Sequence, residues 1–247
     1  MQPELQRNPY ADHLAELNKT NPVLAAEDIY NERGAIIVPK GTQIDEGVSN
    51  KIARFSLRTP LELSVNLKHL ITPKQFYTDI QKAPITLLDD LDDLYVAYKK
   101  ELMRQCGNYS LFPLLSQKLT VMRDRLPQVY QYTQSITGIA LSIAMNLGLD
   151  DETMDVIFIA AQMHESGLLN MPSESFKQIN EMDDHAKNKF LQQQLEYGDQ
   201  FLRSVPNLSE RVNRAILEHK ERRDGSGWPA GLVNNSQSIE SQVVGVA

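Results

Sequence analysis

Two short motifs in the C-terminal half of this 247-residue chain combine residue types that bind metals or phosphate groups. One is the pair His164-Glu165, and the other begins at His219 and runs HKERRDGSGWPAGL. Imidazole and carboxylate groups both bind divalent ions, and metal sites in helical proteins are built from side chains on facing helices. His164, Glu165 and His219 are therefore candidate metal ligands. The alternative is that each histidine is a core residue bonded to backbone, and the residues alone leave both interpretations open.

The run that begins at His219 also marks a change of structure. Val212, Ile216 and His219 lie on one helical stripe, so His219 is expected to face inward at a helix end. Glycine and proline then break regular structure. The pattern predicts a loop that carries chemistry or recognition.

The composition is that of an ordinary globular protein, 41% hydrophobic and 23% charged. A net charge of -7 argues against non-specific binding to nucleic acid polymers or anionic membranes. The single cysteine, Cys106, cannot form an intrachain disulfide, and neither a signal peptide nor a membrane-length apolar run is visible. We therefore expect a cytoplasmic protein with no membrane span and no nucleic acid polymer as partner.

The elements that must position these motifs predict a mainly α fold. We expect a polar N-terminal lead without regular structure, a small α+β module, a helical connector and a helical domain, at residues 1–21, 22–72, 73–125 and 126–247. In the module, turn residues Asn31 and Gly34 separate two short β segments, which predicts a β hairpin. The module holds no catalytic cluster, so a sensory, docking or packing role is expected.

Apolar residues at helical spacing predict one helix at residues 126–147 and a second that begins at Asp150 or Asp151 and runs to His164. A long polar helix is expected at about residues 184–203. Gly148 fits the position just beyond a helix end, and Asn207 with Glu210 fits a capping box for the helix that leads to His219. An acidic run is expected to be a solvated helix face rather than a metal site, at Asp89, Asp90, Asp92 and Asp93.

The motifs resemble a known family. HESGLLNMP (164–172) resembles the HDxGK...P signature of the HD superfamily of metal-dependent phosphohydrolases, and HKERRDGSGWPAGL resembles the HHExxDGxGYPxGL signature of its HD-GYP branch. The segment 132–149 resembles the helix that opens that domain. The resemblance implies an all-helical HD-type domain with a two- or three-metal centre, in which a metal-bridged hydroxide hydrolyses cyclic di-GMP. It also implies that the domain continues beyond Ala247.

When the metal-ligand positions of the family are matched to this sequence, only some of them keep a residue that can bind a metal. His164, Glu165 and His219 keep ligand chemistry, with Glu165 in place of the family's aspartate. Four positions depart from the family's residues: Tyr132, Leu168, Gln194 and Lys220. Tyrosine and glutamine are poor ligands for transition metals, and a lysine brings positive charge to a cation site. The resemblance thus predicts no intact catalytic set and no metal, or iron or manganese at partial occupancy. We hypothesise that Lys220 pairs with Glu165 and replaces the metal electrostatically.

The loop after Lys220 keeps more of the family's pattern, at Arg222, Arg223, Asp224, Gly225, Ser226, Gly227, Trp228 and Pro229. In the family this loop lies near the metal site and is implicated in contacts with diguanylate cyclases. Arg222, Arg223 and Trp228 could hold a phosphate and stack on a guanine. The alternative is that the loop only stabilises the local fold.

Three hypotheses of function follow. The first is a degenerate, non-catalytic HD-GYP-like signalling protein that acts by binding a partner or a cyclic dinucleotide. The second is a metal-dependent cyclic di-GMP phosphodiesterase with a reduced metal site on His164, Glu165 and His219. The third is an interaction scaffold without a nucleotide role.

Overall fold

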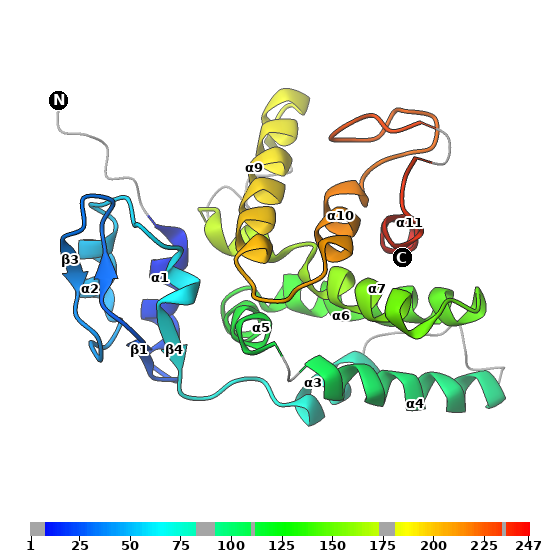
Figure 1. Cartoon of the computed structure of the whole chain (residues 1–247), viewed down its shortest axis with the longest axis horizontal. Helices are drawn as coiled ribbons and strands as arrows, with labels where there is room; N and C mark the ends of the chain where they lie inside the picture. The colour runs from blue at the N-terminus through cyan, green and yellow to red at the C-terminus, as the bar shows by residue number, and fades with distance from the viewer. Residues whose placement is uncertain (1–7, 83–91, 110–111, 173–180, 234–235) are drawn as a thin grey trace.

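The computed structural model describes residues 8–82, 92–109, 112–172, 181–233 and 236–247. In these ranges the molecule is mainly α-helical, with a small module of short strands beside a helical body (Figure 1). The predicted fold class is confirmed. Asp89 and Asp90 of the acidic run lie outside the described residues, as do the side chains of Asp92 and Asp93.

The first described element is a helix, α1 (Pro9–Leu17), so the expectation of a lead without regular structure is wrong here. The Asn8 side chain caps it by accepting a hydrogen bond from the Ala11 N–H, and Pro9 occupies the first turn. Tyr10, Leu14 and Leu17 recur at helical spacing and are all buried. Polar residues between them hid this periodicity, and burial against the rest of the chain stabilises so short a helix.

The N-terminal module contains two small antiparallel sheets. Strands β1 (Val23–Ala25) and β4 (Val65–Leu67) pair with each other, and β2 (Ile29–Tyr30) and β3 (Ile36–Val38) form the predicted hairpin. The Asn31 side chain organises the hairpin turn, because its Oδ1 accepts hydrogen bonds from the backbone N–H groups of Arg33 and Ala35. The helix α2 (Glu46–Ile52) and the 3-10 turn η1 (Leu61–Leu63) complete the module.

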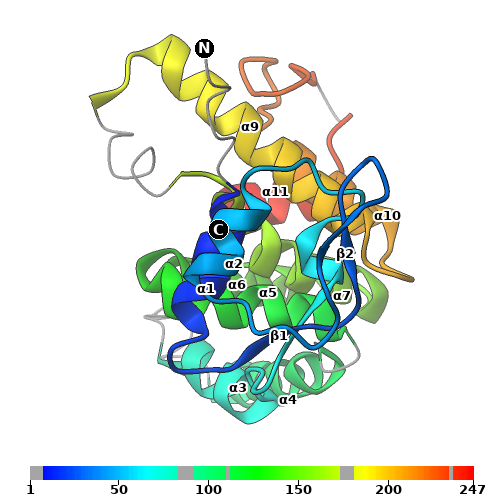
Figure 2. The same ribbon diagram turned by 90° about the vertical axis from the view of Figure 1, so that its left-hand side faces the viewer.

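The segment predicted as a connector is built into the helical body. It contains α3 (Pro73–Gln81), α4 (Asp92–Tyr109) and α5 (Pro113–Arg125). α3 packs on α4 and α6, while α5 packs on α6 and on α1. Figure 2 looks onto the N-terminal module, with α5, α6 and α7 behind it. The module therefore rests on the body through α1 and α5.

The remaining elements position the two histidine motifs. They are α6 (Pro127–Asn146), α7 (Asp151–Met163), η3 (Ser166–Asn170), α9 (Asp184–Arg203), α10 (Glu210–Glu218) and α11 (Ile239–Val246). Gly148 has a φ of +64° after α6, as its sequence position predicts. The predicted capping box at Asn207 is wrong, because Ser209 caps α10 and Asn207 adopts a φ of +59°.

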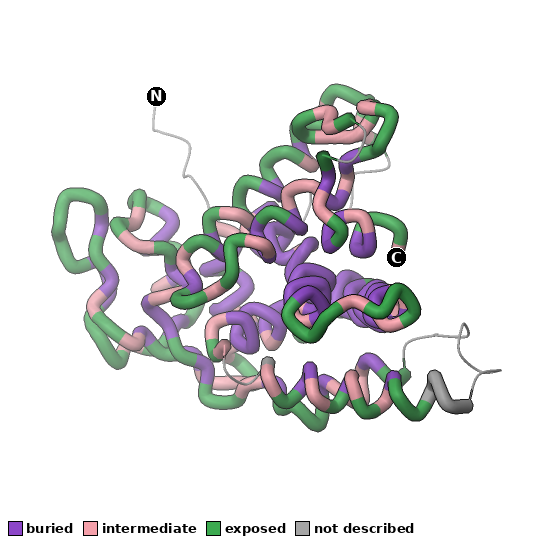
Figure 3. The backbone as a smooth tube through the Cα atoms, turned by 45° about the vertical axis from the view of Figure 1, so that its right-hand side comes forward, coloured by how far each residue is buried: buried purple, intermediate pink, exposed green. Residues whose placement is uncertain are grey.

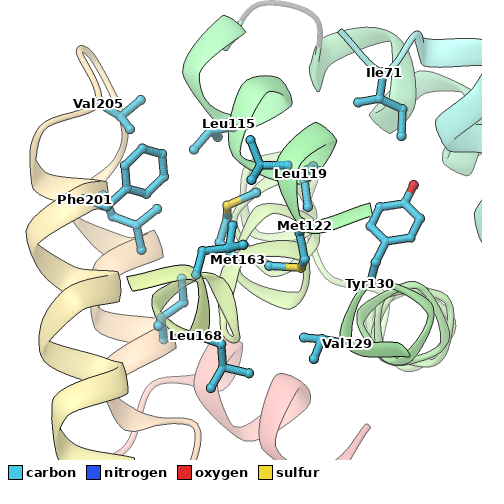
Figure 4. Close-up of a cluster of buried hydrophobic side chains, with 14 of the residues drawn as sticks. Ile71, Leu115, Leu119, Met122, Val129, Tyr130, Met163, Leu168, Phe201 and Val205 are labelled. Carbon is cyan, nitrogen blue, oxygen red and sulfur yellow. The ribbon is translucent and has the colours of Figure 1, made fainter. Parts of the chain in front are cut away.

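The core lies where α6 and α7 cross the body, and both helices are mostly buried there (Figure 3). Side chains from α5, α6, η3 and α9 meet around them (Figure 4), among them Leu119, Val129, Leu168 and Phe201. Shortening one such side chain to alanine typically costs about 2–5 kcal/mol. This core fixes the ends of α7 and α10, where His164 and His219 lie.

Candidate functional site

The structure brings the two histidine motifs together at the ends of two packed helices. His164 follows the last residue of α7, and His219 follows the last residue of α10. Their ring centroids are 5.4 Å apart, with the planes at 72°. Each ring is buried, and each Nδ1 faces a backbone carbonyl one turn earlier, Ala161 O at 2.7 Å and Ile216 O at 2.5 Å. Because Nδ1–H donates to those carbonyls, Nε2 of each ring is left with its lone pair.

Burial keeps both imidazoles neutral. It lowers the pKa of His164 to about 4 and the pKa of His219 to about 3, with the charge of Lys220 acting in the same direction. His219 Nε2 has no hydrogen-bond partner among the described residues. A buried nitrogen without a partner is costly, and such groups are characteristic of functional sites.

Glu165 lies beside these rings and is held by Gln194. Its Oε1 is 3.7 Å from His164 Nε2, and its Oε2 accepts a hydrogen bond from Gln194 Nε2. Burial raises the pKa of Glu165, although Lys220, His219 and the Gln194 hydrogen bond oppose the shift. The amide at position 194 therefore contacts the carboxylate directly.

The hypothesised ion pair between Lys220 and Glu165 is not formed as a direct contact. Within the described parts of the chain, no ion pair of 4.0 Å or less joins these two side chains. Lys220 nevertheless acts on the pKa of Glu165, and both side chains border the same cavities. That the lysine charge replaces a metal stays a prediction.

An open cavity of about 800 Å³ lies over the histidines. Its wall contains all three ligand candidates and the first part of the loop, including His164, Glu165, His219, Lys220, Arg222, Arg223 and Asp224. The end of α11 forms another part of the wall, since Val244 to Ala247 also line it. A smaller, mostly apolar cavity of about 250 Å³ shares Tyr132, Glu165 and Lys220 with the large one.

The four positions at which the sequence is expected to depart from the family's residues border these cavities too. Tyr132 is 53% exposed, and its ring centroid lies 5.9 Å from that of His164. Gln194 is buried on α9, and Leu168 is buried on η3, where it borders the smaller cavity. A tyrosine, an amide and an alkyl chain therefore stand at three of the four positions, and an ammonium group stands at the fourth.

The loop after α10 is held in shape by Glu221, which the sequence did not single out. This carboxylate is buried and accepts hydrogen bonds from the backbone N–H groups of Ala230 and Leu232, the second at 2.9 Å. Asp224 Oδ1 accepts from the Ser226 N–H at 2.9 Å and from its hydroxyl at 2.6 Å. Glu221 was not predicted as a functional residue because it lies in a run of charged residues. The only signal in the sequence is the Gly-rich segment that follows, whose backbone N–H groups need an acceptor.

Two other loop residues lie tightly packed. A Cβ on Gly227 would come within 2.1 Å of the Arg222 backbone nitrogen, so the loop closes on itself there. Trp228 packs against the core and is not among the residues that line the large cavity. The loop thus presents Arg222 and Arg223 to the cavity, while its tryptophan anchors it.

The donors at this site do not fit the two- or three-metal centre that the motif resemblance implies. Among the residues that the structure describes, no group of three or more histidine, cysteine, aspartate or glutamate side chains is arranged to hold a metal. Tyr132, Gln194 and Lys220 add no good ligand for iron or manganese, and the Lys220 ammonium repels cations.

Among the residues that the structure describes, every helix is too short or too polar to cross a membrane.

The sequence model of one family, the HD domain, matches residues 119–247, slightly more than half of the chain. The chain belongs to the HD domain family. The match begins within α5 and includes every element around the cavity. With the glycine-proline loop at residues 219–232 and the relatives below, the chain is an HD-GYP-type HD domain protein.

Curated relatives match about half of the chain. The chain is 29% identical over 117 residues to the cyclic di-GMP phosphodiesterase response regulator RpfG of Xanthomonas campestris, and 30% identical over 135 residues to the cyclic di-GMP phosphodiesterase PdeB of Borreliella burgdorferi. It is 24% identical over 126 residues to the 3'3'-cGAMP-specific phosphodiesterase 1 of Vibrio cholerae. These matches cover 47%, 50% and 48% of the chain, and 31%, 33% and 27% of the relatives. The chain thus spans about a third of the length of the curated relatives it matches.

Proposed function

We propose that this HD-GYP protein is a non-catalytic receptor that binds a cyclic dinucleotide in the cavity over His164 and His219. The observation that carries the proposal is the contact between Gln194 and Glu165, with Lys220 beside it. At positions where the family resemblance implies metal ligands, this chain has a hydrogen bond and a positive charge. The relatives, named as phosphodiesterases of cyclic di-GMP or 3'3'-cGAMP, suggest the ligand class.

The size and charge of the cavity support a phosphate-bearing ligand. Its volume of about 800 Å³ lies within the range of roughly 300–1,000 Å³ that is usual for small-molecule sites. Lys220, Arg222 and Arg223 border it, and arginine is well suited to hold a phosphate through paired hydrogen bonds. Of the carboxylates there, Glu221 and Asp224 already accept hydrogen bonds from the loop, so they are less available to repel an anion.

Calorimetry with cyclic di-GMP, combined with chromatography of the nucleotide, tests this proposal. We expect saturable binding and no linear product. The variant Lys220→Gln should bind at least about tenfold more weakly, since a charge-assisted contact to phosphate is worth about 1.5–3 kcal/mol. Lys74→Gln, on an exposed part of α3, is the matched control and should bind like the wild type. Absence of binding at millimolar nucleotide would contradict the proposal, and so would turnover.

The second candidate is a phosphodiesterase with a reduced metal site. The observation in its favour is the pair of neutral, closely spaced imidazoles of His164 and His219, although Glu165 does not complete a three-ligand group with them. Metal analysis of purified protein separates the two functions, because stoichiometric iron or manganese would favour the enzyme. A triple variant with Tyr132→His, Gln194→His and Lys220→His should gain metal if the rest of the site is competent. Contacts between residues 222–229 and a diguanylate cyclase stay a prediction.

A further inference from the structure

A fully buried ion pair lies at the junction between the N-terminal module and the HD domain. Lys118 on α5 donates a hydrogen bond to Glu62 on η1 at 2.6 Å, and the two residues are 1% and 4% exposed. The Lys118 ammonium is also 4.2 Å from the ring centroid of Tyr10 on α1. A second contact from α5 to the module is the hydrogen bond from Gln117 Nε2 to the Glu62 carbonyl at 2.9 Å.

The same ammonium group reaches the elements that hold the ligand cavity. It donates to Asn170 Oδ1 at 2.7 Å, and Asn170 Nδ2 donates to Glu62 Oε1 at 3.1 Å. It also lies 4.7 Å from the ring centroid of Phe201 on α9. Lys118 therefore contacts the module, η3 and α9 with one charged group.

The turn η3 connects this junction to the cavity wall over a few residues. Asn170 ends η3, and Glu165, which lines the cavity, directly precedes its first residue. η3 is packed closely on α9, because a Cβ on Gly167 would lie 1.9 Å from the Gln194 carbonyl oxygen. A change at the Glu165–Gln194 contact therefore has a short, close-packed route to Asn170.

We propose that the ligand cavity and the N-terminal module are energetically coupled through η3, with Asn170 and Lys118 as the residues that join them. This inference rests on the proposed ligand site, and it makes the module the part of the protein that responds to the ligand. The coupling is reciprocal: whatever alters the junction alters ligand affinity by the same factor that the ligand exerts on the junction.

Asn170 is the residue at which to test this coupling. It is only partly buried, and Asn170→Ala leaves the Lys118–Glu62 pair in place while removing the link from that pair to η3. Asn146→Ala is the control of the same residue type, because the Asn146 side chain is exposed and donates its hydrogen bond to the Ser142 carbonyl within α6.

Hydrogen exchange of the full chain with and without cyclic di-GMP is the first measurement. We expect the nucleotide to change amide exchange in η1 and β4 of the module. We also expect Asn170→Ala to reduce that change and to shift nucleotide affinity at least about fivefold, the lower end of usual allosteric coupling. Asn146→Ala should alter neither. If the nucleotide binds and the module's exchange stays the same, the coupling is overturned and the proposed function stands.

A second arm needs no ligand, so it still decides the coupling if cyclic di-GMP does not bind. Gln194→Ala removes the hydrogen bond to Glu165 at the cavity. We expect it to change exchange in η1 and β4, with that change lost when Asn170→Ala is also present. α4, which lies away from the module in Figure 1, reports any general loosening of the fold. Unchanged exchange in η1 and β4 would overturn the coupling even if the proposed function had already failed.

Discussion

In two places a glutamate with little exposed surface lies near a lysine, and the two pairs differ. At the module junction, Glu62 and Lys118 are in direct contact at 2.6 Å, and Asn170 bonds to both. At the cavity, Glu165 and Lys220 make no such contact, and Gln194 bonds to Glu165 instead. The first site satisfies its charges internally, while the lysine of the second borders the cavity and makes no direct ion pair with its glutamate.

The pKa values of the two carboxyls follow this contrast. Burial alone would raise the pKa of Glu62, but the charge and hydrogen bond of Lys118 outweigh it and hold the pKa below its usual range. For Glu165, burial outweighs the opposing contributions and raises the pKa. A carboxylate whose charge the fold stabilises holds structure together, whereas one whose charge the fold disfavours marks a candidate functional site.

The largest effect is expected at the closed pair. Lys118→Met leaves the Glu62 carboxylate buried without a counter-charge and should lower the free energy of unfolding by about 3–5 kcal/mol. Urea denaturation measures it. The double variant Lys118→Met/Glu62→Leu should recover most of the loss, because the pair is then replaced by apolar side chains. Lys74→Met, on the surface, is the control. A loss below about 1 kcal/mol for Lys118→Met would show that the two sites do not differ as described.

The next effect is a loss of folding stability at acid pH, which results from the two buried histidines at the cavity. Their folded pKa values, about 4 for His164 and about 3 for His219, lie below the ordinary value of 6.5. The folded state therefore binds fewer protons than the unfolded state below pH 6.5, so the stability present above that pH is lost as the pH falls. At about 1.4 kcal/mol per pKa unit, each histidine accounts for about 3 kcal/mol of loss at pH 4.

Unfolding free energies at pH 7 and pH 4 test this sensitivity. His164→Asn should reduce the difference between the two values, because its side chain does not titrate. His13 on α1 also has a pKa lowered to about 4 by burial, so the comparison with the wild type isolates the share of His164. His185→Asn, at the exposed start of α9, is the surface control. An unaltered difference in His164→Asn would contradict the burial of a neutral ring.

A third effect concerns the loop beside the cavity. Glu221→Ala removes the acceptor of the Ala230 and Leu232 amides and should cost about 1–3 kcal/mol. Hydrogen exchange at those two amides measures the change directly. Glu221→Gln, which keeps an acceptor, should have a smaller effect, and Glu32→Ala, on the exposed hairpin, should have none. Protected amides in Glu221→Ala would mean that other contacts hold the loop.

The smallest effect has the opposite sign. The raised pKa of Glu165 means that the folded state favours the protonated carboxyl, so its stabilising contribution is present below pH 4.5 and is lost as the pH rises through the folded pKa. Glu165→Gln, neutral and able to accept from Gln194, should therefore leave the protein equally stable or up to about 1 kcal/mol more stable at pH 7. A clear destabilisation would place Glu165 with Glu62 as a structural carboxylate.

Long helices with regular apolar spacing could be predicted from the sequence, whereas contacts between single residues far apart in the chain could not. α6 spans Pro127–Asn146 within the predicted residues 126–147, because its apolar residues recur at helical spacing. α1 escaped prediction, since only three large apolar residues mark its face and the helix depends on its burial against α2 and α5. Lys118 and Glu62 are separated by 55 intervening residues, and no local pattern connects such a pair.

The candidate site was accessible to sequence reasoning only in part. His164, Glu165 and His219 were named from their residue types and the family motifs, and the structure brings them together. The bond from Gln194 to Glu165 depends on how η3 packs on α9, which the sequence does not reveal. Trp228 could be expected at the cavity from the motif alone, whereas core packing draws its ring away from the lining.

The glycine at position 167 has a consequence for protein engineering. The Gln194 carbonyl oxygen rests where a Cβ on Gly167 would lie, so the backbone at position 194 is located by its neighbour and not by its own side chain. Exchanging Gln194 for another residue should therefore replace the chemical group offered to Glu165 while the point of attachment stays fixed. Position 194 is thus suited to a mutational library in which ligand preference, metal uptake and catalysis are varied from one anchored backbone position.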